Sequence, residues 1–303
     1  LVSDRTLVKL PIPTLVSELM RKQGAHTKIF SDCEGNPTSN QVEAGLTAFR
    51  QHDADGVVAL GGGCPIDVAK AITLTTTHPG SILDYEDGTP GGDTITSNIP
   101  PLIAIPTTAG TGSEVGGSSV ITDSRTHRKV IIWSSHLIPK RVLADPKLTL
   151  SIPRPVTAST GIDALTHNVE AFLSPMPHSI CEGIALEGVH LIFKSLQKSC
   201  DNPSNLDART KMLMASMMGA IAFQKGLGVI HSCAHALSSV HNLHHGLANG
   251  LMIKAGLNFN KKVCKDKLSR LALASNGTNF IDMTQALCNS VGIPHNLRDV
   301  GIN

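Results

Sequence analysis

The sequence predicts two domains, an α/β domain built on a mostly parallel sheet and then an all-helical domain. Up to about residue 154, short apolar runs such as VVAL (57–60) and PLIAI (101–105) alternate with patterns typical of helices. This alternation favours a parallel sheet covered on both faces. From Ala158 onward the pattern is helical, rich in Ala and Met, without a further strand. The prolines of SIPRP mark the boundary, so we expect domains of residues 1–154 and 155–303.

The composition indicates a globular protein and excludes several partners. Of 303 residues, 41% are hydrophobic and 17% charged, enough for a sizeable core. The net charge is +2 without a Lys/Arg block, and aromatic residues make up 3%, so nothing points to nucleic acid or an anionic membrane. No apolar run approaches the roughly 18 residues of a transmembrane helix, and the start does not resemble a signal peptide. The seven cysteines show no tandem CxxC pair, which favours free thiols in the cytoplasm.

The elements of the first domain can be assigned in chain order. Turn residues, amphipathic stretches and apolar runs alternate along it. We expect a buried strand ending at Asp4, a helix over 11–24, a strand over 26–32, a helix over 40–52, a strand over 57–60, a helix with Pro65 near its first position, a long surface loop over 78–99, a strand over 101–105, two β-runs over 120–132 and a closing segment over 141–155.

Two glycine-rich loops each follow an apolar strand directly. The first, GGGCPIDVAK (61–70), leads into a helix, and its glycines leave backbone N–H groups free to approach a pyrophosphate at the positive helix end. It is not a G-x-G-x-x-G loop, so a tight strand-to-helix turn without a ligand is the alternative. The second loop, PTTAGTGSE (106–114), offers hydroxyls and open amides. Together the loops predict a dinucleotide site.

Asp4 stands at the carboxyl end of the first predicted strand. An acidic residue there is well placed to accept hydrogen bonds from a ribose 2′-hydroxyl, which would favour NAD over NADP. On spacing alone, a loop aspartate that caps the next helix is an equally good interpretation.

Histidines cluster near residue 240. Five of the 14 histidines lie between His231 and His245, within GLGVIHSCAHALSSVHNLHHGLANG (226–250). His231 and His235 are four apart, which places them on one helix face. His245 follows in a segment whose glycines suggest a bend or a close backbone approach. The pattern predicts a transition-metal site, but spacing leaves open which of the five imidazoles are ligands: His231, His235, His241, His244 and His245.

A second segment, TGIDALTHNVEAFL (160–173), completes this prediction. Asp163 and His167 are also four apart, and Thr160 is expected to be the N-cap of their helix. One carboxylate and one imidazole from here, with two imidazoles from the later cluster, make a four-ligand N/O site suited to Fe(II) or Zn(II). Ordinary surface or core histidines are the alternative.

These segments resemble the metal-binding signatures of the iron-containing (group III) alcohol dehydrogenases, a family that includes lactaldehyde reductase, propanediol dehydrogenase and butanol dehydrogenases. GIDALTH (161–167) matches the first signature, and His231, His235, His245 and Gly246 match the second. The resemblance implies the dehydroquinate synthase-like fold of that family, with a Rossmann-like nucleotide-binding domain, a helical metal-binding domain and an active site in the cleft between them.

The resemblance also implies individual roles. The metal ligands would be Asp163, His167, His231 and His245. His235 would stand near the nicotinamide and substrate as a catalytic residue without binding metal, and Phe223 would line the alcohol pocket. Cys64 replaces the serine of the family's first glycine loop. The cofactor-binding set would be Asp4, Asn36, Gly61, Gly62, Gly63, Cys64, Asp67, Thr107, Thr108, Thr111 and Lys129.

The function implied is reversible hydride transfer between a primary alcohol, or its aldehyde, and NAD, assisted by Fe(II), with Zn(II) as the alternative metal. The expected protein is a cytoplasmic homodimer or larger homo-oligomer, shortened at both ends relative to the family. Two alternatives remain, an NAD- and metal-dependent lyase or synthase on the same scaffold, and an inactive metal-binding family member.

Overall fold

The computed structural model describes residues 1–302, which divide into two compact units. The first unit comprises residues 1–107 and 113–145, and the second comprises residues 108–112 and the chain from Pro146 onward. The short loop 108–112 therefore belongs with the helical unit. Each unit is described by itself.

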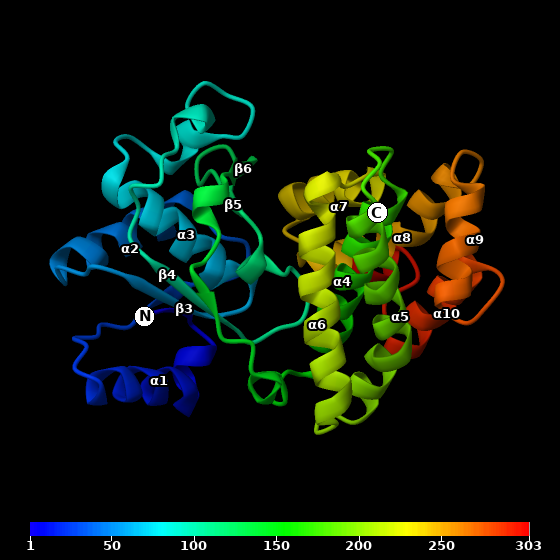
Figure 1. The fold of residues 1–303 in the computed structure, drawn as a ribbon, viewed down its shortest axis with the longest axis horizontal. Coiled ribbons are helices and arrows are strands. Elements are labelled where there is room, and N and C mark those ends of the chain that lie inside the picture. The colour runs from blue at the N-terminus through cyan, green and yellow to red at the C-terminus, as the bar shows by residue number, and fades with distance from the viewer. Residues whose placement is uncertain (303) are drawn as a thin grey trace. The chain divides into compact units, whose positions relative to one another are not determined.

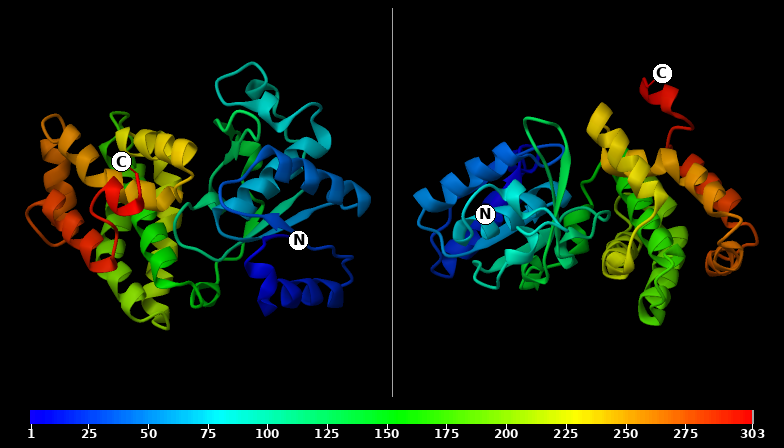
Figure 2. Two further views of the ribbon diagram at one scale, coloured as in Figure 1. Left: turned by 180° about the vertical axis from the view of Figure 1, so that it is seen from behind. Right: turned by 90° about the horizontal axis from the view of Figure 1, so that it is seen from above.

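The first unit contains a five-stranded parallel sheet of strand order β2-β1-β3-β4-β7. Helices α2 and α3 lie on one face of this sheet and α1 on the other (Figures 1 and 2). Apolar strands buried by helices on both sides confirm the predicted fold class of this domain. The elements are β1 (Val2–Asp4), α1 (Pro11–Lys22), β2 (Phe30–Cys33), α2 (Ser39–Gln51), β3 (Val57–Gly61), α3 (Gly63–Thr77), β4 (Leu102–Pro106) and β7 (Arg141–Val142).

The strand order contains a switch point beside β1. From β1 the chain moves to β2 on one side, then returns to β3 on the other side of β1. Parallel sheets bind ligands outside the carboxyl ends of the strands at such a point. Asp4 ends β1 and Gly61 ends β3, so the fold brings these two predicted cofactor residues to the same position.

An antiparallel hairpin, β5 (Ser118–Thr122) and β6 (Lys129–Trp133), and the segment before it are held to α3 by hydrogen bonds of Lys70 and Asp67. The fully buried Lys70 Nζ donates to the backbone oxygens of Ser113, Gly116 and Ser118 at 2.6, 2.7 and 2.8 Å. One oxygen of Asp67 accepts from the Ser113 hydroxyl at 2.5 Å, and the other accepts from the Val120 amide at 3.0 Å. The first glycine loop is thereby fixed to the segment that follows the second.

The second unit is all-helical, as predicted. Its central helix α4 (Arg154–Leu173) is buried along its length from Thr157 to Leu173 and packs against α5, α6 and α8. Figure 1 shows α4 between its neighbours within this unit. A helix buried on every side must offer small or apolar residues or give its polar side chains partners, and α4 carries residues of both kinds. The other helices are α5 (Ser179–Asp201), α6 (Leu206–Ala222), α7 (Val229–His241), α8 (His245–Asn260), α9 (Lys265–Ala274) and α10 (Phe280–Val291).

Several boundaries differ from the sequence predictions. The prediction that Thr160 caps α4 is wrong, because the helix begins at Arg154 after the N-cap Pro153 and the Thr160 hydroxyl donates to the Val156 carbonyl inside the helix. Proline tolerated in a first helical turn explains this earlier start. Strand β2 begins only at Phe30, and α3 begins before Pro65, at Gly63.

The predicted loop over 78–99 contains short helical turns and contributes to the core, where Ile82, Tyr85 and Ile95 are buried. The 3₁₀ turns of the described chain are η1 (Leu7–Lys9), η2 (Ile82–Tyr85), η3 (Gly92–Thr94), η4 (Ser113–Val115), η5 (Ser135–Leu137), η6 (Pro146–Thr149), η7 (Phe223–Lys225) and η8 (Leu297–Val300).

Over residues 1–302, no single helix is long and apolar enough to cross a membrane. The sharply bent pair Leu206–Lys225 and Val229–His241, which meet at 105°, passes that test of length and composition only when taken together.

Glu114 generates a prediction about pH. Burial raises the pKa of this carboxyl from 4.5 to about 7, and the side chain is 2% exposed. Because the folded pKa is the higher one, this group's contribution to stability is complete below about pH 4.5 and is lost as the pH rises through about 7. The loss amounts to roughly 3 kcal/mol. We expect Glu114→Gln to remove that component from the free energy of unfolding measured against pH.

The control is Glu43→Gln, at an exposed position of α2, which should keep the pH dependence of the parent protein. Identical slopes for Glu114→Gln and the parent between about pH 4.5 and 7 would show that Glu114 does not titrate in this way.

Candidate metal centre and cofactor loops

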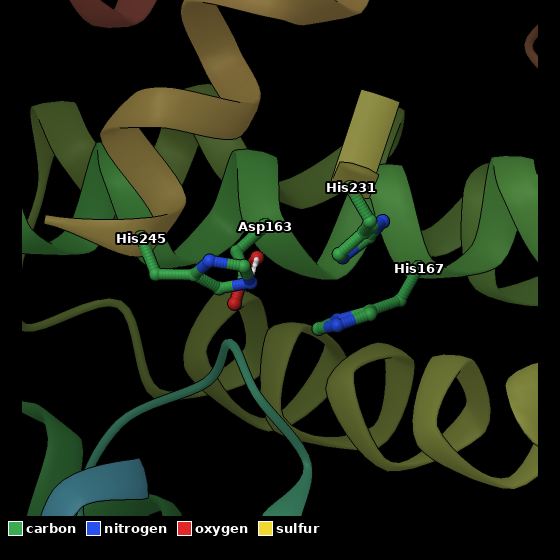
Figure 3. Close-up of side chains that lie close together, drawn as sticks. All are labelled: Asp163, His167, His231 and His245. Atoms are coloured by element: carbon green, nitrogen blue, oxygen red, sulfur yellow. Dashed lines mark ion pairs between the residues drawn. The ribbon is translucent and has the colours of Figure 1, made fainter. Parts of the chain in front are cut away.

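Four side chains of the second unit converge on one point. Asp163 and His167 come from α4, His231 from α7 and His245 from α8, and Figure 3 shows the four lying together. One ligand atom from each lies within 4.8 Å of the others. The imidazoles of His167 and His231 stack with their centroids 4.6 Å apart, and those of His231 and His245 are 5.5 Å apart.

Helix geometry and the short interruption between α7 and α8 produce this convergence. The spacing of four puts Asp163 and His167 on one face of α4. Helix α7 carries His231 and ends at His241, where Asn242 takes the left-handed conformation (φ 52°) as C-cap. The chain then turns, and His245 is the first residue of α8. The interruption between the helices therefore places the two candidate ligands of the histidine-rich segment, His231 and His245, on different helices.

Gly246 allows α8 to approach α4 closely. A Cβ at this position would lie 2.3 Å from the backbone oxygen of Ser159 and 3.2 Å from the Asp163 Cβ. Since backbone cannot yield as a flexible side chain does, only glycine fits. The sequence left open whether the glycines of this segment mark a bend or a close backbone approach. The close approach applies at Gly246, and the turn lies before it, at residues 242–244.

The ionisation states of the cluster suit a cation. Burial opposes the ionisation of Asp163, but His167, His245 and His231 outweigh it and lower the pKa of this carboxyl to about 2. Burial lowers the pKa of His167 to about 4, although Asp163 acts in the opposite direction. An ionised carboxylate beside a neutral imidazole is the form in which both groups bind a metal.

The donor atoms fit a resident metal ion. Within the described residues, Nδ1 of His167 and Nε2 of His231 are buried and have no hydrogen-bond partner. Buried polar atoms are rarely left unsatisfied in native proteins, so a bound ion would account for these two nitrogens. Three imidazoles and one carboxylate suit Fe(II) or Zn(II) and contain no thiolate.

Two residues that the sequence analysis missed contact the cluster. The fully buried Asn249 donates from Nδ2 to Asp163 Oδ1 at 2.7 Å. Glu170, 2% exposed, accepts from His231 Nδ1 at 2.6 Å. Their positions carried a signal, because Asn249 lies four residues after His245 and Glu170 three after His167, each on the ligand's helix face.

The other three histidines of the segment 231–245, and Phe223, lie outside the four-residue cluster. His235 lies on α7 with its ring centroid 5.0 Å from that of His245 and 6.5 Å from that of His231. Phe223 lies in η7, 5.0 Å from the His167 ring. His241 and His244 are exposed and do not belong to the four-residue cluster.

The predicted cofactor residues of the first unit gather at the carboxyl ends of the strands. Gly61 (φ 150°) has room for no Cβ, which would lie 2.3 Å from Pro65 Cγ and 3.3 Å from Asp4 Oδ2. The Asp4 Oδ1 atom accepts from the Thr6 and Leu7 amides at 2.9 and 2.8 Å. Asp4 Oδ1 therefore closes the turn after β1 and does not cap α1, whose N-cap is Leu10, while Oδ2 faces the glycine loop.

The other predicted residues of this set divide between the units. Lys129 Nζ donates to Asn36 Oδ1 at 3.1 Å, and the Thr107 amide donates to the Gly61 carbonyl at 2.9 Å, so these lie in the first unit. Thr108 and Thr111 belong to the loop grouped with the second unit. The neighbouring Cys33 thiol and burial raise the pKa of the Cys64 thiol, which keeps this side chain neutral.

Comparison with known proteins gives a consistent result over the whole chain. Residues 1–146 match the family described as "Iron-containing alcohol dehydrogenase", and residues 157–303 match "Fe-containing alcohol dehydrogenase family, C-terminal". The 4-hydroxybutyrate dehydrogenase of Cupriavidus necator is 38% identical, over all of this chain and 81% of its own length.

Solved structures agree with this match. A 1,3-propanediol oxidoreductase superimposes with a TM-score of 0.92 at 32% identity, covering 100% of this chain and 81% of that one. The sulfoacetaldehyde reductase of Bifidobacterium kashiwanohense, solved in complex with NAD+, gives a TM-score of 0.91 at 31% identity and covers 100% and 80%.

The fold, the Asp/His cluster and these matches define an oxidoreductase of the iron-containing alcohol dehydrogenase class. The chain belongs to the iron-containing alcohol dehydrogenase family.

Gly246→Ala tests the packing of the cluster. The added methyl group would push α8 away from α4 and move His245 from Asp163. We expect a loss of about 1–3 kcal/mol in unfolding free energy together with weaker zinc binding, measured by chemical denaturation and by competition with a chromophoric chelator. Gly183→Ala in α5 is the matched control, because its Cβ would meet nothing within 4 Å. Unchanged zinc affinity in Gly246→Ala would contradict the argument from close approach.

Proposed function

We propose that the protein transfers a hydride reversibly between a primary alcohol, or its aldehyde, and NAD, with a metal ion held by Asp163, His167, His231 and His245. The observation that carries this proposal is the convergence of those four side chains within 4.8 Å, three of them buried. No observation favours a lyase or synthase, and the relatives bear dehydrogenase, oxidoreductase or reductase names.

The residues around the proposed metal ion are assigned different roles. When bound, Fe(II) or Zn(II) would supply a Lewis acid that polarises the substrate oxygen and lowers the pKa of the alcohol. Asp163 contributes the single negative charge of the ligand set, and Asn249 fixes its carboxylate by a 2.7 Å hydrogen bond. His235 is assigned to position the substrate and move its hydroxyl proton, because its ring lies beside His245 without belonging to the ligand cluster. Phe223 is assigned to the alcohol pocket, because it contacts His167.

NAD binding is assigned to residues 1–154 and metal binding to residues 155–303. Gly61, Gly62 and Gly63 would bind the pyrophosphate at the start of α3, next to Cys64 and above Asp67. Asp67 already bonds Ser113 and Val120, so its contribution is to hold the loops. Asp4 would receive the ribose. The remaining assigned residues are Asn36, Thr107, Thr108, Thr111 and Lys129.

We further propose a short-chain alcohol or diol as substrate, since relatives are named for 4-hydroxybutyrate and 1,3-propanediol. All seven cysteines are free thiols, which supports a reducing, cytoplasmic location. A homodimer or larger homo-oligomer is proposed from the resemblance to the family.

Metal removal and single histidine substitutions test the function directly. Purified protein would be stripped with a chelator, then assayed for NADH formation from short primary alcohols and diols before and after addition of Fe(II) or Zn(II). We expect activity only with metal. His245→Ala should weaken metal binding at least about 100-fold, since loss of a ligand exceeds the 10–100-fold effect of an outer-shell change. The matched control, His241→Ala at an exposed position of the same segment, should bind metal normally.

NADH formation that survives complete chelation would contradict the metal's role. Stoichiometric metal, together with neither NADH formation from any alcohol nor NADH consumption with any aldehyde, would instead indicate the lyase or the inactive protein. Equal metal affinity of His245→Ala and His241→Ala would remove His245 from the ligand set.

Asp4→Asn tests the preference for NAD. Asparagine keeps the Oδ1 acceptor for the Thr6 and Leu7 amides but removes the charge that would repel the 2′-phosphate of NADP. We expect the ratio of kcat/KM for NADP over NAD to rise about tenfold, equivalent to about 1.4 kcal/mol. Asp53→Asn, at an exposed position of the first unit, should leave the ratio unchanged. A ratio that is the same in Asp4→Asn and Asp53→Asn would mean that Asp4 does not contact the ribose.

A further inference from the structure

Glu170 is a buried carboxylate on the same helix face as two candidate metal ligands. Counting along α4, Asp163, His167 and Glu170 follow at spacings of four and three, which aligns them. The Glu170 side chain is 2% exposed and accepts three hydrogen bonds from α7. Oε1 accepts from the Ile230 amide at 2.7 Å, and Oε2 accepts from the His231 amide at 3.1 Å and from His231 Nδ1 at 2.6 Å.

The first effect of this carboxylate is to cap α7. The N-cap of that helix is Gly228, which has no side chain to bond the first amides. Glu170 takes over that task from α4, and its negative charge lies at the positive end of the helix. A Cβ on residue 228 would lie 2.7 Å from Glu170 Oε1, so glycine there leaves the space that the carboxylate occupies.

The second effect is on the imidazole of His231. A carboxylate only accepts hydrogen bonds, so the 2.6 Å contact requires the proton on Nδ1. In the neutral ring Nε2 then carries a lone pair. Nε2 is buried, has no hydrogen-bond partner within the described part of the chain, and belongs to the four-residue cluster. The geometry thus presents one defined nitrogen to the centre of the cluster.

We propose that Glu170 is a positioning residue of the metal centre, which holds His231 in the Nδ1–H tautomer and directs its Nε2 lone pair at the ion. The inference rests on the proposed metal site. Helix α4 would then position three of the four ligands, because it carries Asp163 and His167 and orients His231 through Glu170. A carboxylate behind a ligating histidine raises the basicity of that ligand and fixes its orientation.

Glu170→Gln tests this role through metal affinity, independently of enzyme activity. Glutamine keeps the size of the side chain but has one acceptor oxygen in place of two, so it cannot serve both the Ile230 amide and His231. We expect zinc affinity, measured by competition with a chromophoric chelator, to fall 10–100-fold. Glu114→Gln, a buried glutamate of the other unit, should bind zinc like the parent protein.

A purely structural role must be separated from positioning. Asn205→Ala removes the side-chain cap of α6, which bonds the Ala208 amide at 3.0 Å and lies outside the cluster. This variant should lower the Tm without changing zinc affinity. Glu170→Gln with a lowered Tm and the zinc affinity of the parent would show that Glu170 only caps α7, and would overturn the proposal.

Histidine tautomers in the parent protein give a second measurement if Glu170→Gln does not fold. With ¹⁵N-labelled histidine, the metal-free protein should show His231 protonated at Nδ1 and unprotonated at Nε2, with the signal assigned by its absence in His231→Gln. Protonation at Nε2 would overturn the inference. A parent protein that binds no zinc would overturn the metal assignment itself, which distinguishes that failure from a failure of Glu170 alone.

Discussion

The burial of polar groups along α4 constrains the whole helical unit. From Thr157 to Leu173 this helix has no exposed residue, yet it carries Asp163, His167, Asn168 and Glu170. Burying such groups without partners costs several kcal/mol each, so the surrounding helices must supply them. Helix α8 supplies Asn249 to Asp163, α7 supplies His231 to Glu170, and the Asn168 amide reaches the Ala215 carbonyl of α6. The need of the buried polar groups of α4 for hydrogen-bond partners thus helps to determine how three helices pack on it.

The same requirement explains why the centre is suited to an ion. After these hydrogen bonds are made, nitrogen lone pairs and a carboxylate still point at one place. Hydrophobic packing alone would have favoured replacing such residues with apolar ones. Their presence in the best-buried helix of the unit is therefore evidence of function as well as of structure.

In the α/β unit the hydrogen bonds of two α3 side chains have the corresponding role. Lys70 and Asp67 lie on α3, directly after the glycine loop, and their bonds run to Ser113, Gly116, Ser118 and Val120. The loop that ends β3 is thereby tied to the chain that follows β4. Two segments about 50 residues apart in the chain are thus joined by the hydrogen bonds of Asp67 and the fully buried Lys70.

The sequence by itself determined the fold class, the order of the elements and the residue types of the candidate metal centre. Periodicity distinguishes strands from helices locally, and the spacing of Asp163 and His167 places them on one helix face whatever surrounds the helix. The sequence did not determine where α4 begins, because a proline is compatible both with the first turn of a helix and with a boundary before it.

Only the tertiary structure decided which histidines meet and what supports them. His231 and His235 share a helix, but the turn at Asn242 starts a new helix at His245, and spacing cannot give the angle between two helices. Glu170 and Asn249 are ordinary polar residues in the sequence. Their importance arises from burial against α7 and α4, where a hydrogen bond must replace water, and burial is a property of the folded chain alone.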